Sequence, residues 1–193
     1  MSLNTSLSPA VASWTFFVGS VLFTSAATMQ FLMSKAELPE LDLAREDRWT
    51  RIMRPRNTDW TASAIQWVGT IEFNITTLRA ALDAGGSGSA TAQMVWRPDA
   101  IGSILFLVSS AIALAPEVRR RRHGHARSRS WAIAALNMLG SIFFGISAIG
   151  AYLNPNTQQL LSVRWSNGGT LLGALCFLAG ALLLLPRRQT ATT

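Results

Sequence analysis

The stretch WAIAALNMLGSIFFGISAIGAYL, residues 131–153, decides the fold class of this chain. It lies within a longer run, from Ser130 to Val163, that contains no charged side chain. About 18 apolar residues in a helix are enough to cross the hydrocarbon core of a bilayer. Three further charge-free runs occur at 10–33, 100–116 and 165–186. The sequence therefore predicts an all-α protein that crosses a membrane several times.

The composition supports a membrane protein. Of the 193 residues, 49% are hydrophobic and only 14% are charged, whereas about a quarter of a soluble domain is charged. The mean hydropathy is +0.27. These values exclude an ordinary soluble enzyme, a disordered chain and a secreted disulfide scaffold, and the single Cys176 has no partner for an intramolecular disulfide. The net charge of +7 comes from residues beside apolar segments, so membrane topology explains it better than nucleic-acid binding.

We expect five transmembrane helices in a polytopic bundle. The first is too long for a signal-peptide core and has no Lys or Arg before it, so it is expected to be retained. Three prolines, Pro116, Pro155 and Pro186, are expected to mark helix ends. The second helix is the least apolar. The expected helices are Val11–Met33, Trp60–Leu82, Asp99–Pro116, Trp131–Leu153 and Ser166–Pro186.

The distribution of basic residues predicts the topology. Arginines are concentrated in the segments 34–59 and 119–129 and after residue 186, while the intervening loops carry few. By the positive-inside rule, the N-terminus is outside and the C-terminus is cytoplasmic, and we expect a bacterial inner membrane. Segment 34–59 is expected to form an amphipathic cytoplasmic loop. Tryptophan near each helix start is expected to anchor the helix at the interface; these residues are Trp14, Trp60, Trp96, Trp131 and Trp165.

An internal repeat is visible in the sequence. WTASAIQWVGTIEF at 60–73 aligns with WAIAALNMLGSIFF at 131–144. The expected organisation is an N-terminal helix within residues 1–33, the loop 34–59, and two copies of a helical hairpin at 60–122 and 131–188, in parallel orientation. The phrase Gly-[Ser/Thr]-x-x-Phe occurs at 19–23, 69–73, 102–106 and 140–144, with GTLLG at 169–173 as an altered form.

The glycines in these helices predict close helix packing. Lipid tails are as apolar as leucine, so membrane helices associate where small residues let their backbones approach. The residues expected to serve in helix packing are Gly19, Gly69, Gly102, Gly140, Gly145, Gly169, Gly173 and Gly180.

Hairpins that carry Trp followed by Gly-Ser-x-x-Phe resemble the YrhK-like family of bacterial membrane domains. The resemblance covers both hairpins, about two thirds of the chain. It implies a membrane-embedded helical fold and supplies no catalytic residues.

The second expected helix contains the most informative polar residues. On a helical wheel, Gln66 and Asn74 fall on one stripe, and Glu72 and Arg79 fall on nearly the opposite stripe, so this helix is expected to be the most enclosed. A carboxylate at the bilayer centre costs about 2.5–3.5 kcal/mol on insertion scales. Glu72 therefore has two interpretations. It is a functional group, which serves as a proton or cation site or as a polar contact to a partner helix, or it is a structural group, neutral or paired, that fixes helix orientation.

One further amide has a counterpart in the repeat. Asn137 aligns with Gln66, and the two amides are expected to hydrogen-bond across the interface between the copies.

No catalytic or metal-binding motif is present in the sequence. His123 and His125 lie among arginines, where a cation would be repelled, so we expect a solvated loop, no metal and no cofactor. The favoured function is a non-catalytic accessory or scaffold protein acting through helix–helix contacts. The alternative is a small transporter or channel for protons, cations or a small solute that uses Glu72. The expected partners are the bilayer and either another membrane protein or further copies of the chain, without nucleic acid.

Overall fold

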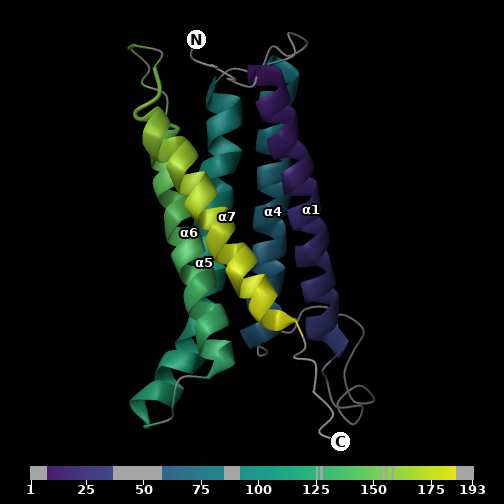
Figure 1. Ribbon diagram of the computed structural model, residues 1–193, viewed down its shortest axis with the longest axis vertical. Coiled ribbons are helices and arrows are strands. Elements are labelled where there is room, and N and C mark those ends of the chain that lie inside the picture. The colour runs from purple at the N-terminus through teal and green to yellow at the C-terminus, as the bar shows by residue number, and fades with distance from the viewer. Residues whose placement is uncertain are drawn as a thin grey trace, which may run out of the picture.

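The computed structural model describes residues 8–36, 58–84, 92–124, 126, 128–152, 154, 156–157 and 159–185. These residues form an all-α bundle of five helices, which run alternately up and down (Figure 1). The helices are α1 (Pro9–Ala36), α4 (Thr58–Ala84), α5 (Ala92–Arg122), α6 (Arg129–Gly150) and α7 (Val163–Leu184). The predicted all-α fold class is confirmed.

Four of the helices are long and apolar enough to cross a membrane: Ala10–Ser34, Trp96–Arg122, Arg129–Gly150 and Val163–Leu184. Helix α4 does not reach that hydropathy, because Gln66, Glu72, Asn74 and Arg79 lie within it. Large apolar side chains cover the outer surface of the bundle, including Leu22, Ile149 and Leu171, each more than 60% exposed. The chain is a membrane helical protein whose outer surface contacts the lipid bilayer.

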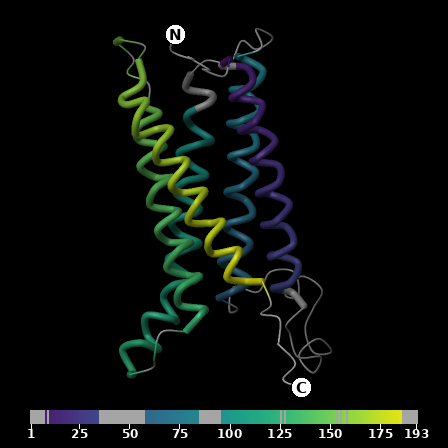
Figure 2. The backbone as a smooth tube through the Cα atoms, viewed as in Figure 1, coloured from purple at the N-terminus to yellow at the C-terminus, as the bar shows by residue number. Residues whose placement is uncertain are grey.

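The helices pack in chain order. Helix α1 packs on α4, α4 on α5, α5 on α6, and α6 on α7. Figure 2 shows α7 running obliquely in front of the bundle, while α1 lies beside α4. Helices α1 and α7 meet through Phe23 and Phe177, whose ring centroids are 5.4 Å apart.

Helix α5 is longer than the sequence indicated. It begins at Ala92 and continues through Pro98 and Pro116 to Arg122, so the prediction that Pro116 ends this helix is wrong. A proline removes its own N–H from the helical ladder and its ring crowds the carbonyl four residues earlier, yet α5 stays helical through Pro98 and Pro116. Since an unpaired backbone group in hydrocarbon costs several kcal/mol, the neighbouring residues keep their helical bonds through both prolines.

The ends of α6 and α7 also differ from the prediction. Helix α6 ends at Gly150 rather than Leu153, because Gly150 lies against the start of α7, where its carbonyl accepts from the Ser162 N–H at 2.9 Å. Helix α7 begins at Val163 rather than Ser166, because the Ser162 hydroxyl accepts from the Trp165 N–H and caps it. Pro155, Pro186 and residues 37–57 of the predicted amphipathic loop lie outside the described residues.

Helices α4 and α6 begin the two predicted hairpins, and α6 is the more enclosed of the two. Seven of its 22 residues are buried, compared with six of 27 in α4. The prediction that α4 is the most enclosed helix is therefore wrong. Its outer side carries the exposed Val68 and Leu78.

Candidate functional site

Five phenylalanines fill the centre of the bundle, and each comes from a different helix. Phe106, Phe144 and Phe177 are buried, and Phe23 and Phe73 pack against them. Neighbouring ring centroids lie 5.1–5.8 Å apart in tilted or edge-on arrangements, which aromatic pairs prefer. Each ring sits near the middle of its helix, so the phenylalanine cluster occupies the middle of the bundle axis.

Each phenylalanine of the cluster follows a glycine by four residues. Four of these glycines form two pairs. A Cβ added at Gly102 would lie 3.1 Å from the Gly69 carbonyl oxygen, and one at Gly140 would lie 3.1 Å from that of Gly173. A Cβ at these positions would crowd the facing backbone, so glycine favours this close approach.

The sequence alignment placed the motif of α7 one turn too early. The phrase that contributes to the phenylalanine cluster is GALCF at 173–177, with Gly173 and Phe177, rather than GTLLG at 169–173. Both glycines of GTLLG face α6: a Cβ at Gly169 would lie 2.7 Å from the Phe143 carbonyl oxygen. The sequence signal for Phe177 was the spacing of four after a glycine, without the hydroxyl residue.

The remaining predicted packing glycines have different surroundings. A Cβ at Gly180 would lie 3.0 Å from Asn137 Oδ1 in α6, and one at Gly145 would make an ordinary contact with Leu107. At Gly19 nothing lies within 4 Å of the added atom. Gly19 is therefore the glycine of the repeated phrase that packs against no described residue.

Hydroxyl groups and an amide join α1 to α4. Ser20 and Thr77 share a hydrogen bond of 2.7 Å, Asn74 Nδ2 donates to Thr24 Oγ1 at 2.9 Å, and Trp67 Nε1 donates to Thr28 Oγ1 at 2.9 Å. The hydroxyls on α1 recur every four residues and so line one face of that helix. That spacing was the available signal for this interface, which the sequence interpretation did not use.

Serines join the other helices. Ser103 of α5 donates to the Phe144 carbonyl of α6, and Ser141 of α6 donates to the Phe106 carbonyl of α5. Ser110 and Ser141 share a hydrogen bond of 2.7 Å, and Ser147 of α6 shares one with Thr170 of α7. Small polar residues thus connect each helix to the next.

The two predicted amides lie in different interfaces. Gln66 Oε1 accepts from Ser109 of α5 at 3.4 Å, while Asn137 faces Gly180 of α7. Each amide contacts the second helix of its own predicted hairpin. The expectation that the two amides bond to each other is wrong, because Gln66 bonds to Ser109 of α5 and Asn137 faces α7.

Glu72 lies beside the phenylalanine cluster but outside it. Its side chain is half-buried, and among the described residues no hydrogen bond or ion pair reaches its carboxylate. The half-buried Arg79 is two turns further along α4. Asn74 contributes one more polar atom, since its Oδ1 is buried without a donor in the described part of the chain. Asp99 is the predicted start of the third helix. It lies half-buried inside α5, which begins at Ala92.

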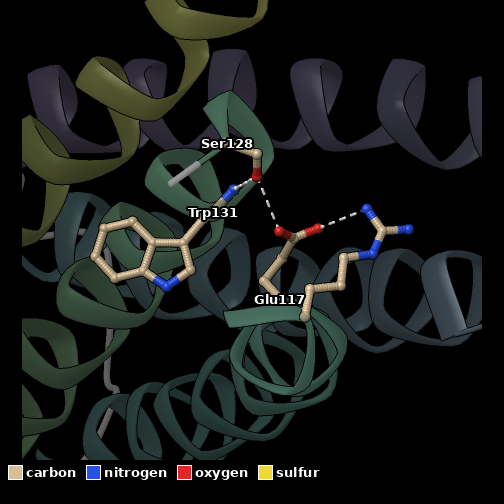
Figure 3. Close-up of polar contacts among 4 residues, drawn as sticks. Glu117, Ser128 and Trp131 are labelled. Atoms are coloured by element: carbon tan, nitrogen blue, oxygen red, sulfur yellow. Dashed lines mark hydrogen bonds and ion pairs between the residues drawn. The ribbon is translucent and has the colours of Figure 1, made fainter. Parts of the chain in front are cut away.

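The end of the bundle that carries the basic residues is also organised. Glu117 near the end of α5 accepts from Ser128 Oγ at 3.0 Å, and Ser128 caps α6 by accepting from the Trp131 N–H (Figure 3). The Arg120 guanidinium lies 3.5 Å from Glu117, and that of Arg121 lies over the Trp131 ring. These contacts join the end of α5 to the start of α6.

The tryptophans divide into exposed and packed residues. Trp14 and Trp165 are 43% and 57% exposed, as suits a position at the interface. Trp60 lies against Phe31, and Trp96 Nε1 donates to the Ala148 carbonyl of α6. Trp96 therefore joins two helices in addition to any role at the membrane surface.

The described residues include two histidine or cysteine side chains that bear on metal or thiol chemistry, His123 and Cys176. Within the searched part of the chain, no group of three or more His, Cys, Asp or Glu could hold a metal ion. His123 is exposed at the end of α5, His125 lies outside the described residues, and Cys176 is half-buried in α7.

No protein-family model matches this chain, and comparisons with curated proteins and with solved structures also give no match.

Proposed function

We propose that this chain is a non-catalytic integral membrane protein that acts through helix–helix contacts, as an accessory or scaffold for another membrane protein. One observation carries the proposal: the phenylalanine cluster occupies the middle of the bundle axis, where a transport pathway would run. The hydroxyl groups and glycines around it are engaged in contacts between helices.

The proposal includes α4 as a fifth membrane span. Helix α4 packs between α1 and α5, and its contacts with α1 extend from Trp60 beside Phe31 to Thr77 beside Ser20. A helix enclosed this way shares the environment of its neighbours. Its polar residues are tolerated where they bond to other helices rather than face lipid.

The proposal also includes the duplicated hairpin. Equivalent contacts support it: Gly69 faces Gly102 as Gly140 faces Gly173, and Gln66 faces Ser109 as Asn137 faces Gly180. The same proposal includes a likeness to YrhK-like domains, a location in a bacterial inner membrane, and an orientation with a cytoplasmic C-terminus.

A small transporter is the second candidate. Two observations favour it: Glu72 is a half-buried carboxylate without a described partner, and Asn74 Oδ1 is a buried acceptor without a described donor. Polar groups of this kind inside a membrane often mark ion pathways.

Native mass spectrometry separates the two candidates. The tagged chain would be purified from its own membrane in a mild lipid-preserving system and weighed. A companion protein in fixed stoichiometry is the expected result. A lone chain or a homo-oligomer would contradict the accessory function and favour transport.

A further inference from the structure

Helix α1 presents a regular face that no described helix covers. Its residues alternate in spacing between four and three positions, the 3.5-residue period of left-handed helix pairs. All are exposed, with Leu22, Met29 and Met33 between 65% and 67% exposed. We call this face the α1 seam; it consists of Thr15, Gly19, Leu22, Ala26, Met29 and Met33.

Helices α5 and α7 bury the corresponding face. In α5 the equivalent positions include Pro98, Gly102 and Ser109, which are buried, and Gly102 and Ser109 contact α4. In α7 they are Gly169, Gly173 and Gly180, which are buried against α6. The three helices are matched by their Gly-x-x-x-Phe phrases and run in the same direction, so they are comparable position by position.

The other side of α1 confirms the comparison. The serine after the phrase glycine reaches the next helix along the chain in both cases: Ser20 bonds to Thr77 of α4, and Ser103 bonds to the Phe144 carbonyl of α6. Helix α1 therefore stands to α4 as α5 stands to α6. Unlike α5, it has no described helix on its seam.

We propose that the α1 seam binds one transmembrane helix of a separate membrane protein, running antiparallel to α1. The helices that cover the seams of α5 and α7 define its chemistry. Both carry an amide, then glycine three residues later, then phenylalanine four residues after that: Gln66, Gly69 and Phe73 in α4, and Asn137, Gly140 and Phe144 in α6. The bound helix presents its glycine to Gly19.

A second copy of this chain supplies no free helix of this type. Its α4 and α6 already use these residues against its own α5 and α7. We therefore assign the bound helix to another protein. This inference rests on the proposed accessory function, and it names the surface through which that function operates.

A synthetic peptide tests the chemistry of the seam directly. A labelled peptide of residues 129–150, which carries the amide, glycine and phenylalanine, would be added to the full chain in lipid vesicles, and binding followed by energy transfer. The Gly19→Leu variant should weaken binding about ten-fold or more by blocking close approach. The matched control is Gly168→Leu, whose added Cβ also meets nothing within 4 Å and which should bind like wild type. Equal binding by both variants would overturn the inference, since the peptide would then be occupying another site.

Photo-crosslinking in the native membrane identifies the occupant. A photoreactive phenylalanine analogue at Leu22 should crosslink to the companion found by mass spectrometry, and the same analogue at the exposed Ile104 of α5 should not. A companion that co-purifies without a crosslink at Leu22, or that stays bound to Gly19→Leu, would overturn the seam assignment but leave the accessory function intact. A crosslink to a second copy would overturn the separate-protein assignment. Absence of any companion would instead contradict the proposed function.

Discussion

Adjacent glycines in α7 differ sharply in their surroundings, and this gives a matched pair of variants. A Cβ at Gly169 would lie 2.7 Å from the Phe143 carbonyl oxygen and 2.9 Å from the Ser147 nitrogen, both backbone atoms that cannot move aside easily. At Gly168 nothing lies within 4 Å. We expect Gly169→Leu to lower the free energy of unfolding by about 1–3 kcal/mol, the usual cost of overpacking. Gly168→Leu should leave it unchanged, as measured by unfolding in detergent. Equal destabilisation by both would contradict the packing at Gly169.

The phenylalanine cluster predicts unequal costs for its members. Phe106 is fully buried and contacts the rings of Phe23, Phe73, Phe144 and Phe177. We expect Phe106→Ala to cost about 3–5 kcal/mol of unfolding free energy, because it leaves a cavity at the centre of the bundle. The half-buried Phe23 should cost less when truncated. Thermal unfolding of the two variants checks this order. A larger loss of stability in Phe23→Ala than in Phe106→Ala would contradict the position of Phe106 at the centre of the cluster.

At the residue scale, the sequence predicted most of the glycines that make close helix contacts, but it also included one, Gly19, that makes none with the described residues. The motif identified Gly69, Gly102 and Gly140. A Cβ added at any of these three would lie 3.1–3.3 Å from a backbone oxygen of the facing helix. It placed Gly19 in the same class, and Gly19 is open. The motif indicates that a helix is able to pack closely at its glycine. Whether another helix lies there depends on how all the helices of the bundle are arranged.

At the element scale, the interface between α1 and α4 should behave as a coupled polar contact. Thr24 Oγ1 accepts from Asn74 Nδ2 and lies 3.3 Å from the Thr70 carbonyl that it donates to. Hydrogen bonds between membrane helices contribute about 0.6 kcal/mol on average. We expect a double-mutant cycle of Thr24→Val and Asn74→Leu to show coupling of about that size in unfolding free energy. Strictly additive effects would indicate that the two side chains act independently.

The helices themselves were largely predictable, and their ends were not. Apolar runs without charge identified α1, α5, α6 and α7, because crossing a bilayer demands such a run. The ends depend on contacts that single-sequence patterns do not contain. Gly150 ends α6 because the start of α7 packs against it. Helix α5 continues through Pro116, and Glu117 in the next position accepts from Ser128, the cap of α6.

At the scale of the whole molecule, the phenylalanine cluster predicts a sealed bundle. Vesicles containing the purified wild-type chain should show no proton or potassium flux above that of empty vesicles, as followed with a pH-sensitive dye. A hydrophobic constriction of packed rings excludes water and ions. Flux that disappears in Glu72→Gln would contradict the accessory function and establish the transporter.

The proposed orientation is also testable on the whole molecule. Ser130 lies at the basic end of the bundle, and Thr157 lies in the opposite connection between α6 and α7. In a Cys176→Ser background, a membrane-impermeant maleimide should label Thr157→Cys on intact cells and Ser130→Cys only after permeabilisation. The reverse pattern would place the N-terminus in the cytoplasm.

The order of packing has a consequence for how this chain is made. Because each helix packs on the one before it, most native contacts are local in sequence, and such low contact order favours rapid folding. Helices can dock one at a time as synthesis delivers them to the membrane. The contact between Phe177 and Phe23 joins the last helix to the first, and it forms only when the chain has been made as far as α7. In a chain that stops before α7, the rings of Phe106 and Phe144 would lack their contacts with Phe177, which distinguishes such a chain from the finished protein.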